Sequence, residues 1–161
     1  MKVLFLCTAN SCRSIISEAV FNHLAPVGVR AYSAGSHPSG EVNPMATKLL
    51  STHGIDTRGL HSKPIEAHAE LSPDVVVTVC DQAAGEACPV YFGNTLRAHW
   101  GLTDPSRASG SARDIQRAFE ETLGLVQART REFLAARPWA DGRENLATLV
   151  AAIGKTKTGT A

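Results

Sequence analysis

Apolar residues along the chain form four short runs, which predict strands. Residues 2–6 and 75–79 are apolar almost throughout, and the second run is β-branched at every position. Runs of this kind are typical of strands buried on both faces of a parallel sheet. Residues 29–34 predict a third strand, which ends at Gly35, and residues 96–99 predict a short fourth one.

Between these runs, apolar residues recur every three or four positions, which predicts amphipathic helices. The first helix follows the opening strand and ends near Pro26. The second begins after Asn43, a residue suited to cap a helix, with Pro44 in its first turn. A long helix is expected over residues 111–136 and a short one over 146–153.

Strands that alternate with helices are typical of an α/β fold with a parallel sheet and right-handed crossovers. Functional sites in such sheets lie beyond the carboxyl ends of the strands. Cys7 directly follows the first strand, and Cys80 follows the run 75–79. We therefore expect both cysteines at the same edge of the sheet, although they are far apart in the sequence.

Composition favours an enzyme over a nucleic-acid or membrane protein. The 161 residues carry a net charge of +1, too balanced for a nucleic-acid or membrane partner, and no segment is apolar enough for a signal peptide or a membrane span. We expect a cytoplasmic protein, whose thiols stay reduced. The four cysteines are then better explained by catalysis, metal binding or packing than by structural disulfides.

The most informative segment is the turn after the first strand, which reads CTANSCRS over residues 7–14. Its backbone N–H groups and the N-terminus of the next helix create a positive field that suits an anion. The planar guanidinium of Arg13 can bind two oxygens of a tetrahedral oxyanion, and the same field is expected to hold Cys7 as a nucleophilic thiolate. The predicted oxyanion-binding residues are Thr8, Ala9, Asn10, Ser11, Cys12, Arg13 and Ser14.

Three side chains of this turn carry separate expectations. Ser14 is placed to donate a hydrogen bond to the Cys7 thiolate, which would lower the pKa of that thiol further. Asn10 suits the left-handed backbone that such a loop requires. Cys12 is expected to pack rather than to react.

An aspartate later in the chain is the candidate general acid. Asp104 and Pro105 follow the last predicted strand, at the edge where Cys7 is expected. An aspartate beside a proline is common in turns, but at this edge the carboxyl group can protonate a departing oxygen.

Cys80 and Cys88 enclose seven residues, in which Gly85 and several small side chains make rearrangement easy. Three explanations are open: structural thiols, a zinc site or a redox relay. Zinc fits poorly, because seven residues is not a usual chelating gap and no nearby histidine completes the set. We favour the relay, in which Cys80 attacks a sulfur adduct on Cys7 and Cys88 resolves the resulting disulfide.

The remaining ionisable residues give weaker signals. The six histidines show no metal-ligand spacing, so no metal site is expected. His99 and Trp100 are interpreted as the packed end of a strand, and Glu18 as a solvated residue of the first helix.

Three segments together resemble the low-molecular-weight protein tyrosine phosphatase superfamily: CTANSCRS at 7–14, SAG at 33–35 and the pair Asp104-Pro105. Cys80 with Cys88-Pro89, and His99-Trp100-Gly101, resemble more narrowly its arsenate reductase branch, particularly the thioredoxin-coupled type. The resemblance covers about residues 2–136. We predict a reductase domain over 1–140 and a C-terminal extension over 141–161, with a short helix and a flexible tail.

The resemblance implies a fold and a reaction. The fold is a three-layer α/β sandwich with a four-stranded parallel sheet flanked by helices. The reaction is reduction of arsenate to arsenite, which contributes to arsenic detoxification. Cys7 would be the nucleophile, Arg13 the oxyanion clamp and Asp104 the acid. Cys80 and Cys88 would be the relay thiols.

The resemblance also implies partners. Phosphate and sulfate would compete with arsenate. The reductant would be an external dithiol, either thioredoxin or glutaredoxin with glutathione, and no bound cofactor is expected. Some relatives bind potassium beside the loop through an acidic residue. The matching stretch here is His61-Ser62-Lys63, and we expect no potassium site because the lysine repels a cation and can itself supply positive charge.

Two rival functions use part of the same residues. A low-molecular-weight phosphatase would hydrolyse phosphoesters through a phosphocysteine on Cys7, without the relay. It would also need aromatic residues at the mouth of its site, and the chain holds only two tyrosines and two tryptophans. A thiol-based sensor could instead capture arsenite or another soft metal ion through Cys7, Cys80 and Cys88, but it would leave Arg13 and Asp104 without a role.

Overall fold

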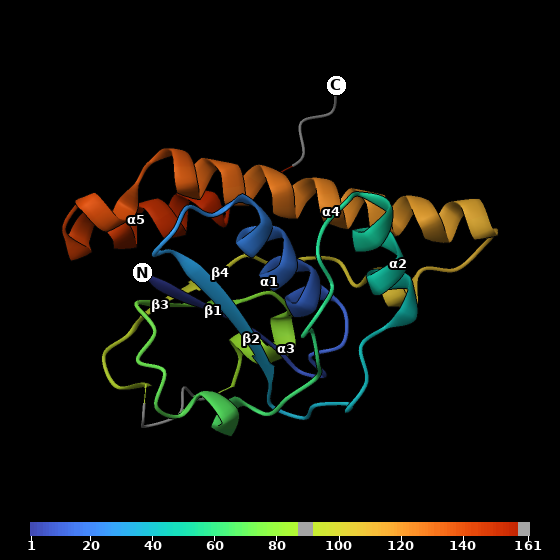
Figure 1. The fold of residues 1–161 in the computed structure, drawn as a ribbon, viewed down its shortest axis with the longest axis horizontal. Coiled ribbons are helices and arrows are strands. Elements are labelled where there is room, and N and C mark those ends of the chain that lie inside the picture. Colours follow the sequence, from blue (N-terminus) through green and yellow to red (C-terminus); the bar gives the residue numbers. More distant parts are fainter. Residues whose placement is uncertain (87–91, 158–161) are drawn as a thin grey trace.

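The structure is a computed structural model that describes residues 1–86 and 92–157. Its centre is a parallel sheet with the strand order β2-β1-β3-β4 (Figure 1). The strands are β1 (Lys2–Cys7), β2 (Arg30–Gly35), β3 (Val75–Thr78) and β4 (Leu96–His99). The four predicted strands and their parallel arrangement are confirmed.

The helices are α1 (Arg13–Leu24), α2 (Pro44–Thr52), α3 (Asp81–Ala84), α4 (Ala112–Ala135) and α5 (Arg143–Ile153), with short 3-10 turns η1 (Ile65–His68), η3 (Pro105–Arg107) and η4 (Pro138–Ala140). Side-chain caps explain where two of them begin, and the one at Asn43 was predicted. The Asn43 side chain accepts from the Met45 N–H at 2.8 Å, and Ser111 forms a capping box with Asp114. The one-turn α3 was not predicted, since its segment was expected to be a loop.

The two faces of the sheet are covered unequally. On one face, α1, α2, α4 and α5 pack over a large apolar core, in which β1 places Val3 and Phe5. On the other face, Leu4 and Leu6 of β1 belong to a smaller cluster that is covered by the segment around η1. This alternation along β1 follows from the two-residue period of a strand. The fold is therefore a four-stranded parallel sheet flanked by helices, as predicted.

The C-terminal helix packs into the larger core. Trp100, just after β4, donates its indole N–H to the Val150 carbonyl of α5 at 2.9 Å, and Ile153 is fully buried. Gly154 lies so close to β4 that a Cβ atom there would stand 2.4 Å from the His99 carbonyl oxygen. Buried Arg129 of α4 donates to backbone carbonyl oxygens on both sides of this contact, those of Gly101, Gly154 and Thr156. The boundary near residue 140 stays a prediction, and residues 158–161 of the predicted tail lie outside the described part.

Within residues 1–86 and 92–157, none of the helices combines the length and the apolarity that a membrane crossing demands.

Candidate active site

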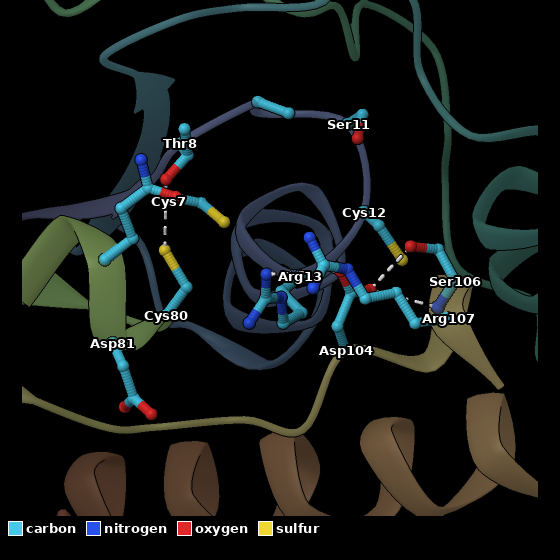
Figure 2. Close-up of a pocket in the computed structure, with 12 residues that line it drawn as sticks. Cys7, Thr8, Ser11, Cys12, Arg13, Cys80, Asp81, Asp104, Ser106 and Arg107 are labelled. Carbon is cyan, nitrogen blue, oxygen red and sulfur yellow. Dashed lines mark hydrogen bonds and ion pairs between the residues drawn. The ribbon is translucent and has the colours of Figure 1, made fainter.

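A cavity of about 340 Å³ opens at the carboxyl ends of β1 and β3 (Figure 2). Three segments wall it: the loop from β1 to α1, the start of α3, and the η3 turn. Both cysteines that were expected at this edge contribute to it, as does Asp104. The lining residues are Cys7, Thr8, Ala9, Ser11, Cys12, Arg13, Cys80, Asp81, Gln82, Asp104, Ser106 and Arg107.

The loop after β1 is held from behind by Asn10. This residue is fully buried and adopts a left-handed backbone with φ 47°, as the sequence predicted. Its amide N–H group donates to Ser14 Oγ at 2.8 Å and to Ser33 Oγ at 3.0 Å, and its carbonyl oxygen accepts from the Lys63 N–H at 3.0 Å. Asn10 therefore fixes the loop from outside the cavity instead of lining it.

The predicted hydrogen bond from Ser14 to Cys7 is not among the contacts of the described residues. The Ser14 hydroxyl oxygen accepts instead from Asn10 at 2.8 Å, and Ser14 is fully buried. Its position at the first turn of α1 directs its hydroxyl toward Asn10, which supports the loop, rather than toward the Cys7 thiol. Ser14 is thus a structural partner of the loop.

A glycine at the end of β2 lets the loop approach the sheet. A Cβ atom on Gly35 would lie 2.5 Å from the Thr8 carbonyl oxygen and 3.0 Å from Asn10. The backbone of Gly35 is not in the left-handed region, so close approach rather than backbone strain explains the residue. This is the last residue of the SAG segment singled out in the sequence.

Below the loop lies a buried ion pair. The Lys63 ammonium is 3.7 Å from a Glu18 carboxylate oxygen, donates to Ser33 Oγ at 3.3 Å, and donates to the His61 carbonyl at 2.9 Å. Burial lowers the pKa of Lys63, and the nearby Glu18 carboxylate opposes that shift. The interpretation of Glu18 as a solvated residue is wrong, because its side chain is only 13% exposed. Lys63 supplies the positive charge at this position.

Cys80 lies at the N-terminus of α3 and faces the loop of Cys7 (Figure 2). Its sulfur accepts from the Ala83 N–H at 3.4 Å and is 3.6 Å from Thr8 Oγ1. Both Cys7 and Cys80 are buried and both are free thiols. The cavity therefore brings together two sulfurs that are separated by 73 positions in the sequence.

The two thiols change each other's protonation. The interaction with Cys80 and burial raise the pKa of Cys7, although Arg13 and the Thr8 N–H oppose the shift. The interaction with Cys7, together with the Thr8 hydroxyl and the Ala83 N–H, lowers the pKa of Cys80 to about 5. The pair thus shares one negative charge, which the hydrogen bonds from the Thr8 hydroxyl and the Ala83 N–H favour on Cys80. The thiolate state of Cys7 stays a prediction: Arg13 and the Thr8 N–H of the loop favour it, as expected, and the neighbouring Cys80 opposes it.

The guanidinium of Arg13 is anchored at the opposite wall. It donates to the Leu102 carbonyl at 3.1 Å and to Asp104 Oδ2 at 3.4 Å. The other oxygen of Asp104 accepts from the N–H and the hydroxyl of Ser106, at 3.0 and 2.6 Å, and Arg107 Nε lies 3.7 Å from Oδ2. The structure brings the predicted clamp and the predicted acid into direct contact. The sequence analysis missed Ser106 and Arg107, whose only signal is their place directly after Asp104-Pro105.

Two further cysteines had separate expectations. Cys12 is buried in the larger core and also lines the cavity, and burial and Asp104 raise the pKa of its thiol to about 12. This agrees with a packing residue. Cys88 lies outside the described residues, so its part in the relay stays a prediction. In the described part of the chain, no group of three or more His, Cys, Asp or Glu side chains is placed to hold a metal ion.

Comparison with known proteins gives a consistent result. The family model described as low molecular weight phosphotyrosine protein phosphatase matches residues 2–144. The arsenate reductase of Bacillus subtilis is 35% identical over 131 residues, which is 81% of this chain and 93% of that protein. The arsenate reductase of Shouchella clausii is 35% identical over the same shares.

Solved structures agree with the sequence matches. An arsenate reductase in its phosphate-binding state is 29% identical, with a TM-score of 0.67 over 93% of this chain and 98% of that one. A thioredoxin-dependent arsenate reductase from Corynebacterium glutamicum is 28% identical, with a TM-score of 0.65 over 87% of this chain and 63% of that one. A tyrosine phosphatase from Erwinia amylovora, 21% identical with a TM-score of 0.66, shares the fold.

Proposed function

This chain belongs to the low molecular weight phosphotyrosine protein phosphatase family, and from that premise we propose that it is an arsenate reductase, which reduces arsenate to arsenite with its own thiols as electron donors. The observation that carries the proposal is the second sulfur in the cavity, Cys80, beside the candidate nucleophile Cys7. Hydrolysis of a phosphoester needs one nucleophilic thiol. Reduction of an oxyanion needs a second thiol within reach of the first.

The first step forms a bond between Cys7 and arsenic. The arsenate monoanion binds between the loop N–H groups and Arg13, which turns from Asp104 to the oxyanion. The Cys7 sulfur attacks arsenic, one As–O bond breaks, and the oxygen departs as water with the thiol proton and the proton it already carried. Asp104 relays the thiol proton to that oxygen. The product is a Cys7–arsenic(V) adduct.

The second step reduces arsenic. The Cys80 thiolate attacks the Cys7 sulfur, a Cys7–Cys80 disulfide forms, and the electron pair of the S–As bond goes to arsenic. Arsenic(V) becomes arsenic(III) and leaves as arsenite, which takes up protons from water. Two hydrogen bonds to the Cys80 sulfur, from the Thr8 hydroxyl and the Ala83 N–H, support this order, because they lower the pKa of Cys80 without depending on the Cys7 thiol and so favour a thiolate as the attacking group.

The third step returns Cys7 to its reduced form. A Cys88 thiolate attacks Cys80, a Cys80–Cys88 disulfide forms, and Cys7 leaves as a thiolate. An external dithiol then reduces the new disulfide. Thioredoxin is our first choice of donor, because a similar protein from Corynebacterium glutamicum is described as thioredoxin-dependent. Such a cycle fits a reducing cytoplasm.

The alternative function is hydrolysis of phosphoesters through a phosphocysteine on Cys7. Cys7, Arg13 and Asp104 would suffice for it. None of the described lining residues is aromatic, so this part of the wall offers no surface for a phenyl ring. Slow hydrolysis of aryl phosphates as a side reaction is compatible with the site.

The deciding experiment is a steady-state assay with arsenate, thioredoxin, thioredoxin reductase and NADPH. Cys80→Ser and Cys88→Ser each reduce NADPH consumption to the background rate, because each interrupts the thiol relay. Calorimetric titration with phosphate checks that both variants still bind the anion. Arg13→Ala is the control that loses turnover and anion binding together.

Unchanged turnover in either cysteine variant would contradict the relay. Hydrolysis of p-nitrophenyl phosphate at a higher kcat/KM than arsenate reduction, with no effect of Cys80→Ser, would favour the phosphatase. Replacing thioredoxin by glutaredoxin and glutathione in the same assay identifies the electron donor.

A further inference from the structure

His99, the last residue of β4, is fixed at both nitrogens of its ring. Nδ1 lies 2.9 Å from Thr78 Oγ1 of the neighbouring strand, and Nε2 lies 3.0 Å from Asp81 Oδ1. An imidazole with a partner on each nitrogen has its ring plane and its direction determined. The ring therefore connects the rigid end of the sheet to α3.

The chain leaves room for this ring. A Cβ atom on Gly101 would stand 2.9 Å from His99 Nε2 and 3.5 Å from its Cε1. The Gly101 backbone is outside the left-handed region, so the backbone itself would accept an alanine. The Cβ atom of that alanine would fit only if the His99 imidazole shifted. The missing side chain at 101 thus permits the contact between His99 and Asp81.

Asp81 follows Cys80 directly and is the first residue of α3. Its side chain is fully exposed, and Figure 2 shows it pointing away from the two thiols. Within residues 82–86, the described remainder of this segment, few side-chain hydrogen bonds reach the rest of the molecule. Glu86 accepts from Ser36 at 3.1 Å, and Cys80 contacts Thr8 at 3.6 Å. The hydrogen bond to His99 therefore ties down the end of α3 that carries the sulfur.

We propose that His99 is a positioning residue for the thiol relay, which holds Cys80 beside Cys7 through its hydrogen bond to Asp81. The proposal deepens the proposed function and rests on it for its biological meaning. The physical claim is narrower. His99 raises the effective concentration of the Cys80 thiol at Cys7, and it touches neither thiol nor the anion.

The effective concentration can be measured without arsenate. In a background with Cys12→Ser and Cys88→Ser, the protein is equilibrated with mixtures of oxidised and reduced dithiothreitol. Oxidised dithiothreitol accepts two electrons and two protons from Cys7 and Cys80, so that their disulfide forms as dithiothreitol is reduced. Quantification of the disulfide by mass spectrometry gives the effective concentration.

His99→Ala lowers that effective concentration about fivefold, because an exposed pair contributes at most about 1 kcal/mol and a released α3 samples more positions of Cys80. Asp81→Ala gives a similar loss, and the double variant is no worse than either single variant, since both remove one contact. Gly101→Ala gives a smaller loss in the same direction. The Kd for phosphate stays within about twofold of wild type in His99→Ala and Gly101→Ala, which leave the lining of the cavity unchanged.

The matched control is His53→Ala. His53 makes the same kind of contact, 2.9 Å from Glu120, and its side chain is 38% exposed compared with 39% for His99. It joins α2 to α4, far from the thiols in the fold, so the effective concentration stays at the wild-type value. A fivefold loss in this variant would mean that any such surface pair changes the measured effective concentration, and would overturn the proposal.

Two outcomes separate this inference from the proposed function. A wild-type effective concentration in both His99→Ala and Asp81→Ala overturns the inference even if arsenate is reduced. A fivefold loss in a protein that reduces no arsenate leaves the inference standing and removes the proposed function. Asp81 is fully exposed, so Asp81→Ala keeps the test valid if His99→Ala fails to fold.

Discussion

The two walls that carry Cys7 and Cys80 are supported in opposite ways. The wall of Cys7 is a loop with a second layer of buried polar groups behind it, in which Asn10 makes three hydrogen bonds. The wall of Cys80 is a single helical turn, and its side-chain ties through Asp81 and Glu86 lie at or near the surface. The first wall is part of the core, and the second is attached to its edge.

This difference matches what each wall has to do. N–H groups that bind an oxyanion act best when they already point at it, since no energy is then spent on reorganisation. In the proposed relay the wall of Cys80 has the other task, because its sulfur would leave Cys7 and reach another thiol. Segments with few buried contacts and exposed hydrogen bonds open at the lowest free energy. Rigidity on one side and easy release on the other suit a relay.

The largest effect is expected from removal of the support behind the Cys7 loop. Asn10→Ala leaves the buried Lys63 N–H without its acceptor and puts an alanine in a left-handed conformation. Together these lower the free energy of unfolding by about 3 kcal/mol. Urea denaturation measures the loss. Arg137→Ala is the control: Arg137 also has a positive φ, 48°, but it is exposed and already carries the strained Cβ atom, so almost no loss is expected. Equal losses would mean that the buried hydrogen bonds contribute nothing.

A smaller effect should appear when Cys7 is removed and the loop is kept. In a background without Cys12 and Cys88, Cys80 is charged above pH about 5, so its alkylation by iodoacetamide is already near its plateau at neutral pH. Cys7→Ala removes the main cause of this low pKa, and the profile moves to higher pH. Alkylation rates with mass-spectrometric assignment measure the shift. Thr8→Val should shift the profile less, and an unchanged midpoint in Cys7→Ala would contradict the thiol pairing.

The smallest effect is expected at the end of the Cys80 wall that carries Glu86. Ser36→Ala removes the hydrogen bond to Glu86 and lowers the free energy of unfolding by only about 0.5 kcal/mol. Hydrogen exchange is the sharper measurement, because the amides of 81–86 should exchange faster while those of β1 do not. Ser39→Ala, which loses a comparable bond to the Glu41 carbonyl, should leave both segments unchanged. Faster exchange throughout the sheet would show that the two walls are not independent.

The sequence predicted those features that depend on neighbouring residues. The strands follow from continuous apolar runs, the start of α2 from Asn43, and the loop geometry from Asn10. The anion loop itself was predicted because strand, turn and helix follow one another directly. In each case the cause lies within a few residues of its effect.

What the sequence missed depends on contacts between distant segments. Glu18 reads as an ordinary helix residue until Lys63, 45 positions later, is placed beside it. The protonation of Cys7 could not be predicted from the loop alone either, because it depends on the position of Cys80 as well as on Arg13 and the Thr8 N–H. The one-turn α3 is too short for a periodic pattern and begins at a cysteine, which is not a usual capping residue.

The contact between α5 and β4 has a practical consequence for protein engineering. Truncation before α5 would strip the indole of Trp100 of its carbonyl partner and expose the apolar side of the strand that ends in His99. We expect a truncated protein of this kind to keep its anion cavity, but to transfer electrons between its thiols more slowly in the proposed reaction. Affinity tags and fluorescent labels at this terminus are best separated from Gly154 by a flexible spacer, since the backbone there has no room to move toward the sheet.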